Sequence, residues 1–300
     1  MRIVSLVPSA TEITCALGLA DALVGISHDC DFPPDVLGKP VLSEAAITVT
    51  QPSGVIEGRI RGLVHAGRSV YHLAEEALTR LAPDLILTQE LCTVCAPSYS
   101  LVKRAAKLLD AEVKIVSLEP RGLGDMLDNI LLVGELTGTA PRAHALVELL
   151  EARIEAVRAC SIVHRPRVVC LEWMDPVYVG GHWVPEMVEV AGGLDVLGRR
   201  GEPSRAVGWD EVVAAGPDIL VLMPCGFDVM RTRAEMGALT TRPGWAELPA
   251  VRRGRVFLTD ASSYFNRPGP RLIEGLEMLA SVIHPEVFLF PCPAGRIERK

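Results

Sequence analysis

The second half of this sequence repeats the first half. Arg2–Pro8, an apolar run that opens the chain, has a counterpart in Arg167–Glu172 near its middle. Two further pairs of segments follow in the same order and at comparable intervals, namely Ala82–Leu87 with Gly216–Val221 and Glu112–Leu118 with Gly254–Thr259. A duplicated unit of this kind predicts two similar α/β lobes. Because small ligands bind preferentially in clefts between domains, it also predicts a ligand cleft between the lobes.

The order of apolar runs within each repeat predicts strands that alternate with helices. Arg2–Val7 is a short apolar run followed by a proline, as expected of a buried strand, and Leu85–Thr88 is a second run of this type. Ser9, followed three residues later by Glu12, has the spacing of a capping box and predicts that a helix starts at Ser9. Strands that alternate with helices form parallel sheets, so we expect an α/β fold with a parallel sheet in each lobe.

The segment between the two repeats is helical by pattern. Apolar residues recur at helical spacing from Leu123 to Ala159, with an interruption around Gly138 and Pro141. This predicts one helix of moderate length and then a longer one, which together connect the lobes. The predicted domains are therefore an N-terminal α/β lobe over 1–121, a helical connector over 122–162 and a C-terminal α/β lobe over 163–300.

Composition and charge narrow the class of partner. With 300 residues, of which 49% are hydrophobic, the chain can form two domains that each have a core. A formal charge of −7 argues against nucleic acid as a partner, because phosphate contacts need clustered Lys and Arg. No run approaches the ~20 apolar residues of a membrane span, which argues against membrane insertion.

The N-terminus and the cysteines predict a cellular location. Met1 is followed at once by a predicted strand, without the basic start and apolar stretch of an export signal. The eight cysteines then indicate reduced thiols or metal ligands rather than disulfides. The sequence as written therefore predicts a cytoplasmic protein, whereas a start codon further upstream would make it periplasmic or extracellular.

Several loops that follow predicted strands carry polar or reactive side chains. An open parallel sheet binds its ligands at the carboxyl ends of the strands, where such loops lie. The loops are His28–Cys30, Cys92–Cys95, Glu172–Asp175 and Gly180–Glu186. In a two-lobed protein they would all face one cleft, and this convergence is the best local indication of a site. Within the last loop, Trp183 and Glu186 adjoin His182, so a ligand contact by His182 is about as favoured as an ordinary hydrogen bond.

The same loops contain a candidate metal site. Cys30, Cys92, Cys95 and His182 offer thiolate and imidazole ligands of the kind that bind zinc, copper or iron. Cys92 and Cys95 are spaced as half of a closed zinc site or as a redox pair, and buried cysteines can also serve as small apolar residues. A metal-dependent or thiol-redox enzyme in the cytosol is therefore an alternative function.

Segments throughout the chain resemble the helical-backbone class of periplasmic binding proteins (class III), and most closely its cobalamin-binding members. This class receives cobalamin, haem and ferric siderophores for ABC importers. In the first lobe the matching segments are Arg2–Glu12, Val24–Ser27, Asp31–Pro34 and Pro83–Leu87. In the second lobe they are Val188–Gly193, Trp209–Val212, Pro217–Val221, Tyr264–Arg267 and Pro270–Arg271. The resemblance implies two α/β lobes joined by a long helix, with the ligand cleft between them.

The resemblance also implies a set of ligand contacts. Aromatic side chains in those relatives flank the corrin ring, and an arginine near the last strand reaches its polar edge. The positions that match in this chain are Tyr178, Trp209, Tyr264 and Arg267, whereas Asp29 and Gln89 stand where the first lobe of the cobalamin binders has aromatic residues. His182 and Trp183 complete the predicted ligand-binding residues, and His182 could also coordinate the cobalt of a corrinoid.

Catalytic signatures are scarce in this sequence. It contains no Gly-x-Ser-x-Gly elbow, no His-Glu-x-x-His zinc helix and no phosphate-binding loop with Gly-Lys-Ser/Thr. The leading prediction is therefore a protein that binds a corrinoid or a similar metal chelate without catalysis. Its partners would be this small molecule and, if the protein is exported, an ABC importer.

Overall fold

The computed structural model describes residues 1–48, 50–66, 68–90, 102, 113–291 and 293–300. The chain forms two compact units, each of which is described by itself. Unit 1 consists of residues 1–51, 55–120 and 127–147, and unit 2 of residues 52–54, 121–126 and 148–300.

Unit 1 contains a four-stranded parallel sheet with the order β2-β1-β5-β6. Its strands are β1 (Ile3–Ser5), β2 (Leu23–Ile26), β5 (Leu85–Thr88) and β6 (Lys114–Ser117). Every residue of β1 and β5 is buried, as expected of central strands whose two faces are both covered. The predicted strand Leu85–Thr88 is confirmed to the residue.

The first helix, α1 (Pro8–Ala16), starts two residues earlier than a capping box with Ser9 at the N-cap predicts. Val7 occupies the N-cap position and makes no side-chain cap, while Pro8 takes the first helical position, where its missing N–H costs nothing. Ser9 and Glu12 are buried inside the helix instead. The capping-box prediction is therefore wrong, because the proline's fixed φ suits it to this position.

The other described elements of unit 1 precede β5. A small antiparallel sheet pairs β3 (Ser43–Ala45) with β4 (Tyr71–Leu73), and α2 (Ser53–His65) lies between them in sequence. Helix α3 (Glu75–Leu81) then leads into β5. The predicted helix over 98–109 lies outside the described residues, apart from position 102.

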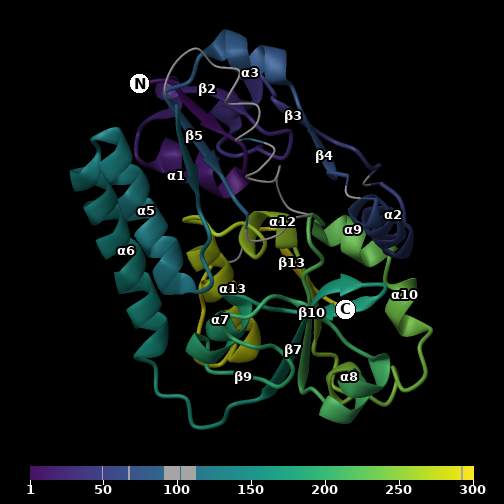
Figure 1. Cartoon of the computed structure of the whole chain (residues 1–300). Coiled ribbons are helices and arrows are strands. Elements are labelled where there is room, and N and C mark those ends of the chain that lie inside the picture. The colour runs from purple at the N-terminus through teal and green to yellow at the C-terminus, as the bar shows by residue number, and fades with distance from the viewer. Residues whose placement is uncertain (49, 67, 91–101, 103–112, 292) are drawn as a thin grey trace. The chain divides into compact units, whose positions relative to one another are not determined.

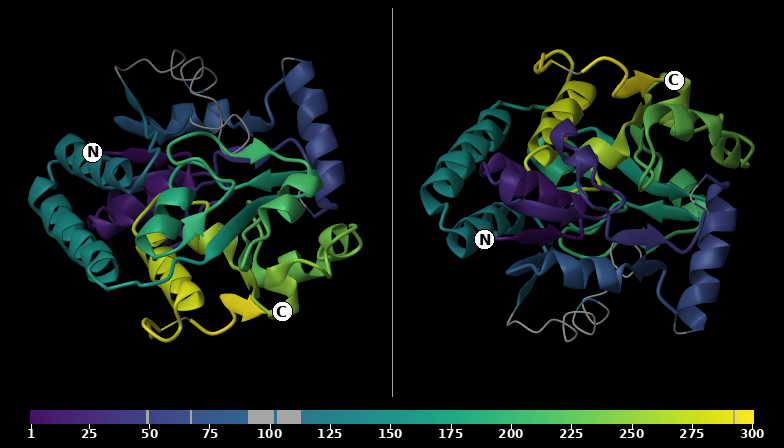
Figure 2. Two further views of the ribbon diagram at one scale, coloured as in Figure 1. Left: turned by 90° about the horizontal axis from the view of Figure 1, so that it is seen from below. Right: turned by 90° about the horizontal axis from the view of Figure 1, so that it is seen from above.

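Two helices follow β6, as predicted for the connector: α5 (Leu123–Thr137) and the longer α6 (Ala140–Arg158). Figure 2 shows the two teal helices side by side. At Gly134 a side chain would clash with Ala143, so the glycine permits this close approach. The first residues of α5 and the second half of α6 belong to unit 2, and the rest of both helices to unit 1.

Unit 2 is built on a larger mixed sheet (Figure 1). Its central strands β7 (Arg167–Met174), β11 (Ile219–Leu222) and β12 (Val256–Thr259) are parallel, as predicted, and β9 (Leu194–Asp195) pairs with β7 in the same direction. Antiparallel strands extend this parallel set on both sides, namely β8 (Val177–Val179) and β10 (Arg205–Ala206) on one side and β13 (Ile297–Arg299) on the other. The α/β fold is confirmed.

The helices of unit 2 cover this sheet and complete its core. They are α7 (Val184–Val190), α8 (Trp209–Ala215), α9 (Val229–Ala234), α10 (Gly237–Thr240), α11 (Pro249–Arg252), α12 (Ala261–Tyr264) and α13 (Leu272–Ile283). Helix α13 is the most apolar of them, with nine of its twelve residues buried, and it packs against α7. It also packs against α12, in the segment that follows β12.

Candidate ligand-binding site

In unit 2 the loops that follow the three central strands form one continuous surface. Register pairs align the ends of β7, β11 and β12 at the carboxyl edge of the sheet. The backbone N–H of Cys225 donates to the Glu172 carbonyl oxygen over 3.0 Å, and that of Ser262 donates to the Phe227 carbonyl oxygen over 3.2 Å. The Gly226 N–H donates to the Asn266 side-chain oxygen over 3.3 Å. Hydrogen bonds thus join all three loops, which matches the sequence-based expectation of a site at this edge.

Two aromatic side chains, Trp173 and Tyr178, give this edge an apolar face. They are paired across the β7–β8 hairpin, and each is partly exposed. The Trp173 ring meets Phe227 edge-on with 5.3 Å between centroids, and its N–H donates to the Asp175 carbonyl oxygen over 3.1 Å. These contacts hold the Trp173 indole in one orientation, as a ring that covers a planar ligand requires.

Three arginines of the segments that follow β11 and β12 add positive charge to this edge. Arg267 and Arg271 are 8% and 9% exposed, which is unusual for this residue type. Arg267 donates to the Ser262 hydroxyl over 3.2 Å. The Arg231 guanidinium lies 3.8 Å from the centre of the Phe227 ring, in a cation–π contact. Buried guanidinium groups next to aromatic rings are suited to a ligand that has both an apolar face and an anionic or polar rim.

Tyr264 belongs to the framework of the same edge. Its side chain is buried, and burial raises the pKa of its phenol. Arg271 lies 5.7 Å from the centre of its ring. Tyr264 ends the short helix α12, which Asp260 caps by accepting a hydrogen bond from the Ser263 N–H over 3.1 Å. The second oxygen of Asp260 accepts from the Arg296 guanidinium, so both oxygens of this buried carboxylate are occupied.

Trp183 and His182 lie immediately before α7. Trp183 is buried and donates its indole N–H to the Phe265 carbonyl oxygen over 2.8 Å, which ties α7 to the segment after α12. His182 adopts the left-handed conformation with φ = 51°, and its N–H donates to the Glu202 carbonyl oxygen over 2.6 Å. Among the described residues its buried Nε2 atom has no hydrogen-bond partner. Burial, and secondarily the charge of Arg121, lowers the pKa of His182, so its imidazole is neutral.

Glu186 and Trp209 have structural partners in unit 2. The carboxylate of Glu186 accepts from the Leu123 N–H over 2.9 Å and from the Arg200 guanidinium over 2.7 Å, so it holds the first turn of α5. Trp209 donates to the Pro243 carbonyl oxygen over 2.7 Å and stacks on Trp245 with 6.1 Å between centroids. Trp245 is confirmed as a packing residue, because it is buried in the hydrophobic core. Trp209 also packs against that core, and a ligand contact by Trp209 stays a prediction.

In unit 1 the corresponding edge is mostly small and polar. The Cys30 thiol is 4% exposed and lies 3.0 Å from the Thr11 hydroxyl and 3.2 Å from that of Ser27. Asp29 follows β2, its carboxylate lies 3.4 Å from Nε2 of His28, and half of its side chain is exposed. Gln89 follows β5 and is 7% exposed. Asp29 and Gln89 therefore both follow strands of this sheet, as predicted.

The predicted metal site gains no support from the described part of the chain. Cys92 and Cys95 lie outside the described residues, and Cys30 and His182 belong to different units. Within the described ranges, no group of three or more His, Cys, Asp and Glu side chains is placed to hold a metal ion. The hydroxyl contacts of Cys30 give its thiol an ordinary buried environment.

Sequence reasoning missed four residues of the unit 2 edge. They are Trp173, Arg231, Asn266 and Arg271. Trp173, Asn266 and Arg271 fall within sequence segments singled out above, but none of them was predicted as a site residue. Nothing in the sequence distinguishes Arg231, since its place over the Phe227 ring depends on how α9 packs.

Comparison with known proteins agrees with the fold. The model of the family described as periplasmic binding protein matches residues 3–263. An uncharacterized ABC transporter substrate-binding lipoprotein, YvrC of Bacillus subtilis (strain 168), is 27% identical over 96% of this chain and 81% of its own length. A vitamin B12-binding protein of Vibrio cholerae is 23% identical over 94% of this chain and 88% of its own length. The apo structure of the periplasmic haem-binding protein RhuT from Roseiflexus sp. RS-1 has a TM-score of 0.69 and 25% identity, and covers 95% of this chain and 98% of its own.

The fold and the match over most of its length define a solute-binding protein of the two-lobed α/β type. The chain belongs to the periplasmic binding protein family. The predicted resemblance to this class is confirmed, and so is the prediction that the protein is not an enzyme. The alternative of a metal-dependent or thiol enzyme finds no support.

Two findings bear on location. Relatives are named as a lipoprotein or as periplasmic proteins, so the predicted cytoplasmic location is not supported. Within the part of the chain that the structure describes, no helix has both the length and the apolar composition needed to cross a membrane.

Proposed function

We propose that the protein binds a corrinoid such as cobalamin and presents it to an ABC importer outside the cytoplasmic membrane. Relatives over more than 90% of the chain are named as vitamin B12-binding proteins, which supports this ligand class. An ABC transporter lipoprotein among the relatives supports the partner and an exported location.

The observation that carries the proposal is the pairing of aromatic and basic side chains at the carboxyl edge of unit 2. Trp173 and Tyr178 offer ring faces, while Arg267 and Arg271 are buried cations near the same loops. A corrin ring has a broad apolar face and a rim of polar amide groups. This edge could meet both parts of such a ligand, with aromatic contact area for the ring and charged donors for the rim.

Haem is the second candidate ligand. The solved structure of a haem-binding relative covers almost the whole chain, and the propionate groups of haem are anions that arginine binds well. The same arginines would serve either ligand. The choice between the two therefore requires a direct comparison in solution.

His182 is a candidate axial ligand for the metal of the bound chelate. A neutral imidazole is the form that binds metals, and the lowered pKa of His182 favours that form. Its Nε2 atom is buried and without a partner in the described structure, so metal contact requires the loop to move. A change in the visible spectrum of bound aquocobalamin in His182→Ala would support this role, and an unchanged spectrum would exclude it.

The test is a visible-absorbance titration of aquocobalamin, and in parallel of haemin, with protein purified under reducing conditions and without added metal. We expect saturable band shifts at one ligand per chain. Saturation with haemin alone would identify haem, rather than a corrinoid, as the ligand. Saturation with neither would refute the proposal.

Trp173→Ala and Trp245→Phe are matched variants for the same titration. Trp173 lies at the proposed edge, and Trp245 is a core residue. Truncation at the edge should weaken binding about tenfold or more, and the conservative core change should not. Equal affinities for Trp173→Ala and the wild type would show that the Trp173 ring does not contribute to ligand binding.

A further inference from the structure

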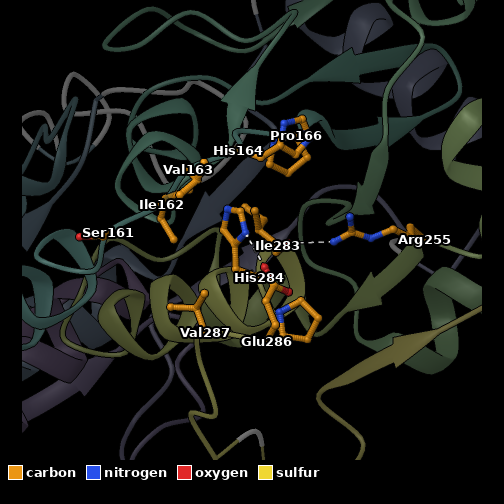
Figure 3. A pocket seen from close by; sticks show the side chains of 11 residues that line it. Ser161, Ile162, Val163, His164, Pro166, Arg255, Ile283, His284, Glu286 and Val287 are labelled. Carbon is orange, nitrogen blue, oxygen red and sulfur yellow. Dashed lines mark hydrogen bonds and ion pairs between the residues drawn. The ribbon is translucent and has the colours of Figure 1, made fainter.

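A pocket lies within unit 2 at the amino edge of the sheet, where β7 and β12 begin (Figure 3). Its volume is about 500 Å³, within the range of small-molecule sites, roughly 300–1,000 Å³. Three segments line it: residues 161–166 before β7, Arg255 before β12, and residues 283–287 at the end of α13. It shares no residue with the carboxyl-edge loops described above.

One part of this pocket is apolar. Ile162, Val163, Ile283 and Val287 contribute aliphatic side chains. Val163 is fully exposed and Val287 is 43% exposed, so part of this apolar surface is in contact with solvent. In the view of Figure 3, Ile162, Val163 and Val287 lie on one side of His284, and Arg255 lies on the other. A ligand that reaches across the pocket would therefore meet hydrocarbon at one end and a cation at the other.

The guanidinium of Arg255 is held in place and has N–H donors that bond to no described residue. Its Nη2 atom donates to the carbonyl oxygens of Val282, over 3.0 Å, and Ile283, over 2.8 Å, at the end of α13. Among the residues that the structure describes, none accepts a hydrogen bond from its Nε or Nη1 atoms. A guanidinium that is held in place and has free N–H groups is preorganised for an oxyanion.

The acidic group in the pocket, Glu286, has a hydrogen-bond partner of its own. His284 is 5% exposed, with Nε2 3.0 Å from the Gly192 carbonyl oxygen and Nδ1 3.1 Å from a Glu286 oxygen. A backbone hydrogen bond, and then His284, lower the pKa of Glu286. Among the described residues no hydrogen bond joins Glu286 to Arg255, so the free N–H groups of Arg255 stay available to a ligand.

Charges of both signs surround Arg255. Glu286 and Asp218 act on it as opposite charges, and Arg299 and Arg253 act on it less strongly as like charges. Asp218, the second acid near Arg255, accepts hydrogen bonds from the Arg253 guanidinium over 2.5 Å and from the Arg167 N–H over 3.0 Å.

We propose that this pocket binds a small amphiphilic anion, namely an aliphatic chain that ends in a carboxylate or a phosphate. The aliphatic part lies against Val163, Ile162 and Val287, and the oxyanion accepts hydrogen bonds from Nε and Nη1 of Arg255. The pocket is separate from the proposed corrinoid site, and its occupancy does not depend on that function.

The first test is calorimetric titration of the full chain with octanoate, octyl phosphate and octan-1-ol, which share one aliphatic chain. We expect one site, and at least tenfold weaker binding of octan-1-ol than of the tighter anion. The tighter of the two anions identifies the preferred head group. Equal binding of octan-1-ol would overturn the anion site, and so would the absence of any binding heat up to about 10 mM anion, an affinity too weak for a specific site.

Two matched variants locate the site. Val163→Asp places a negative charge on a fully exposed part of the apolar wall, and Met230→Asp makes the same change at a 67% exposed position on α9. We expect at least tenfold weaker anion binding in Val163→Asp and wild-type binding in Met230→Asp. Unchanged binding in Val163→Asp would place the anion elsewhere and overturn the proposal. Both variants should bind aquocobalamin as the wild type does. The titrations with anion and with aquocobalamin therefore test the anion site and the corrinoid site separately.

Discussion

The carboxyl edges of the two sheets come from a repeated sequence pattern, yet they carry different chemistry. In unit 1, Ser5 and Ser27 at the ends of β1 and β2 lie in a buried network with Thr11 and Cys30, in which neighbouring polar atoms are 2.8–3.2 Å apart. In unit 2 the corresponding loops carry aromatic rings and buried arginines. The repeat therefore conserves the scaffold and not the side chains at its edge.

This difference has an energetic meaning. A buried network whose members satisfy one another stabilises the fold and leaves little capacity for a ligand. Buried guanidinium groups beside partly exposed rings contribute less to a compact core and more to recognition. We therefore expect substitutions at the unit 1 network to affect stability, and substitutions at the unit 2 edge to affect ligand binding.

The largest contrast should appear in cysteine reactivity. Cys225 is exposed in the loop after β11, whereas Cys30 is buried in the unit 1 network. A buried thiol reacts only when the surrounding structure opens, so alkylation of Cys30 should be at least about 1,000-fold slower than that of Cys225. Iodoacetamide labelling followed by peptide mass spectrometry measures both rates in one sample. Comparable rates would show that the unit 1 network opens readily.

Arg267→Ala should have the next largest effect. Loss of this buried cation should weaken aquocobalamin binding about 100-fold, because the polar rim of the ligand would lose a charged hydrogen-bond donor that is shielded from water. The exposed Arg80 of unit 1 provides the matched control, and Arg80→Ala should bind as the wild type does. The titration described above measures both. Retention of affinity in Arg267→Ala would mean that this arginine serves only the fold.

Thr11→Val tests the unit 1 network, because valine has nearly the same shape as threonine but lacks the hydroxyl group. The Thr11 hydroxyl donates to Ser5 over 2.8 Å and contacts Cys30, so valine leaves buried polar atoms without a partner. We expect a loss of about 2 kcal/mol in the free energy of unfolding. The control is Thr14→Val, since among the described residues the Thr14 hydroxyl bonds only to the Ala10 carbonyl oxygen in its own helix, and its loss should cost less. Urea unfolding gives both values, and equal losses would contradict a special role for the network.

Local patterns in the sequence were enough to predict much of the fold. Leu85–Thr88 and the two helices between the repeats have patterns that depend only on neighbouring residues, and both were predicted correctly. The antiparallel strands that extend the unit 2 sheet were not predicted. Strands of two or three residues, such as Arg205–Ala206, have no periodicity to detect, and they exist because a partner strand is present.

The candidate site was harder to predict, because its residues are defined by partners far away in the chain. The ligand contact of Trp209 stays a prediction, and its N–H bonds to Pro243, 34 residues on, while its ring packs on Trp245. Glu186 lies in a polar stretch of the sequence, and its carboxylate accepts a hydrogen bond from the N–H of Leu123, which is 63 residues away. Tertiary contacts of this kind decide whether a side chain is available to a ligand, and no local pattern encodes them.

The smallest expected effect compares two strained residues, one in each unit. Ala82 in unit 1 and His182 in unit 2 have φ values of 41° and 51°, in the left-handed region that costs a non-glycine residue about 1 kcal/mol. Ala82→Gly and His182→Gly should each raise the free energy of unfolding by about 1 kcal/mol, because glycine adopts this conformation without strain. The second change also removes the buried Nε2 atom that has no partner among the described residues.

The two glycine variants should therefore differ in binding and not in stability. Strain that persists at a residue near a ligand edge indicates a functional reason for keeping the side chain. His182→Gly should alter the spectrum or weaken the binding of aquocobalamin, whereas Ala82→Gly should leave both unchanged. Thermal unfolding and the visible titration, carried out on both proteins, measure the two effects together. If both variants gain stability and bind alike, His182 has no part in recognition, and the ligand contacts of unit 2 reduce to its aromatic rings and arginines.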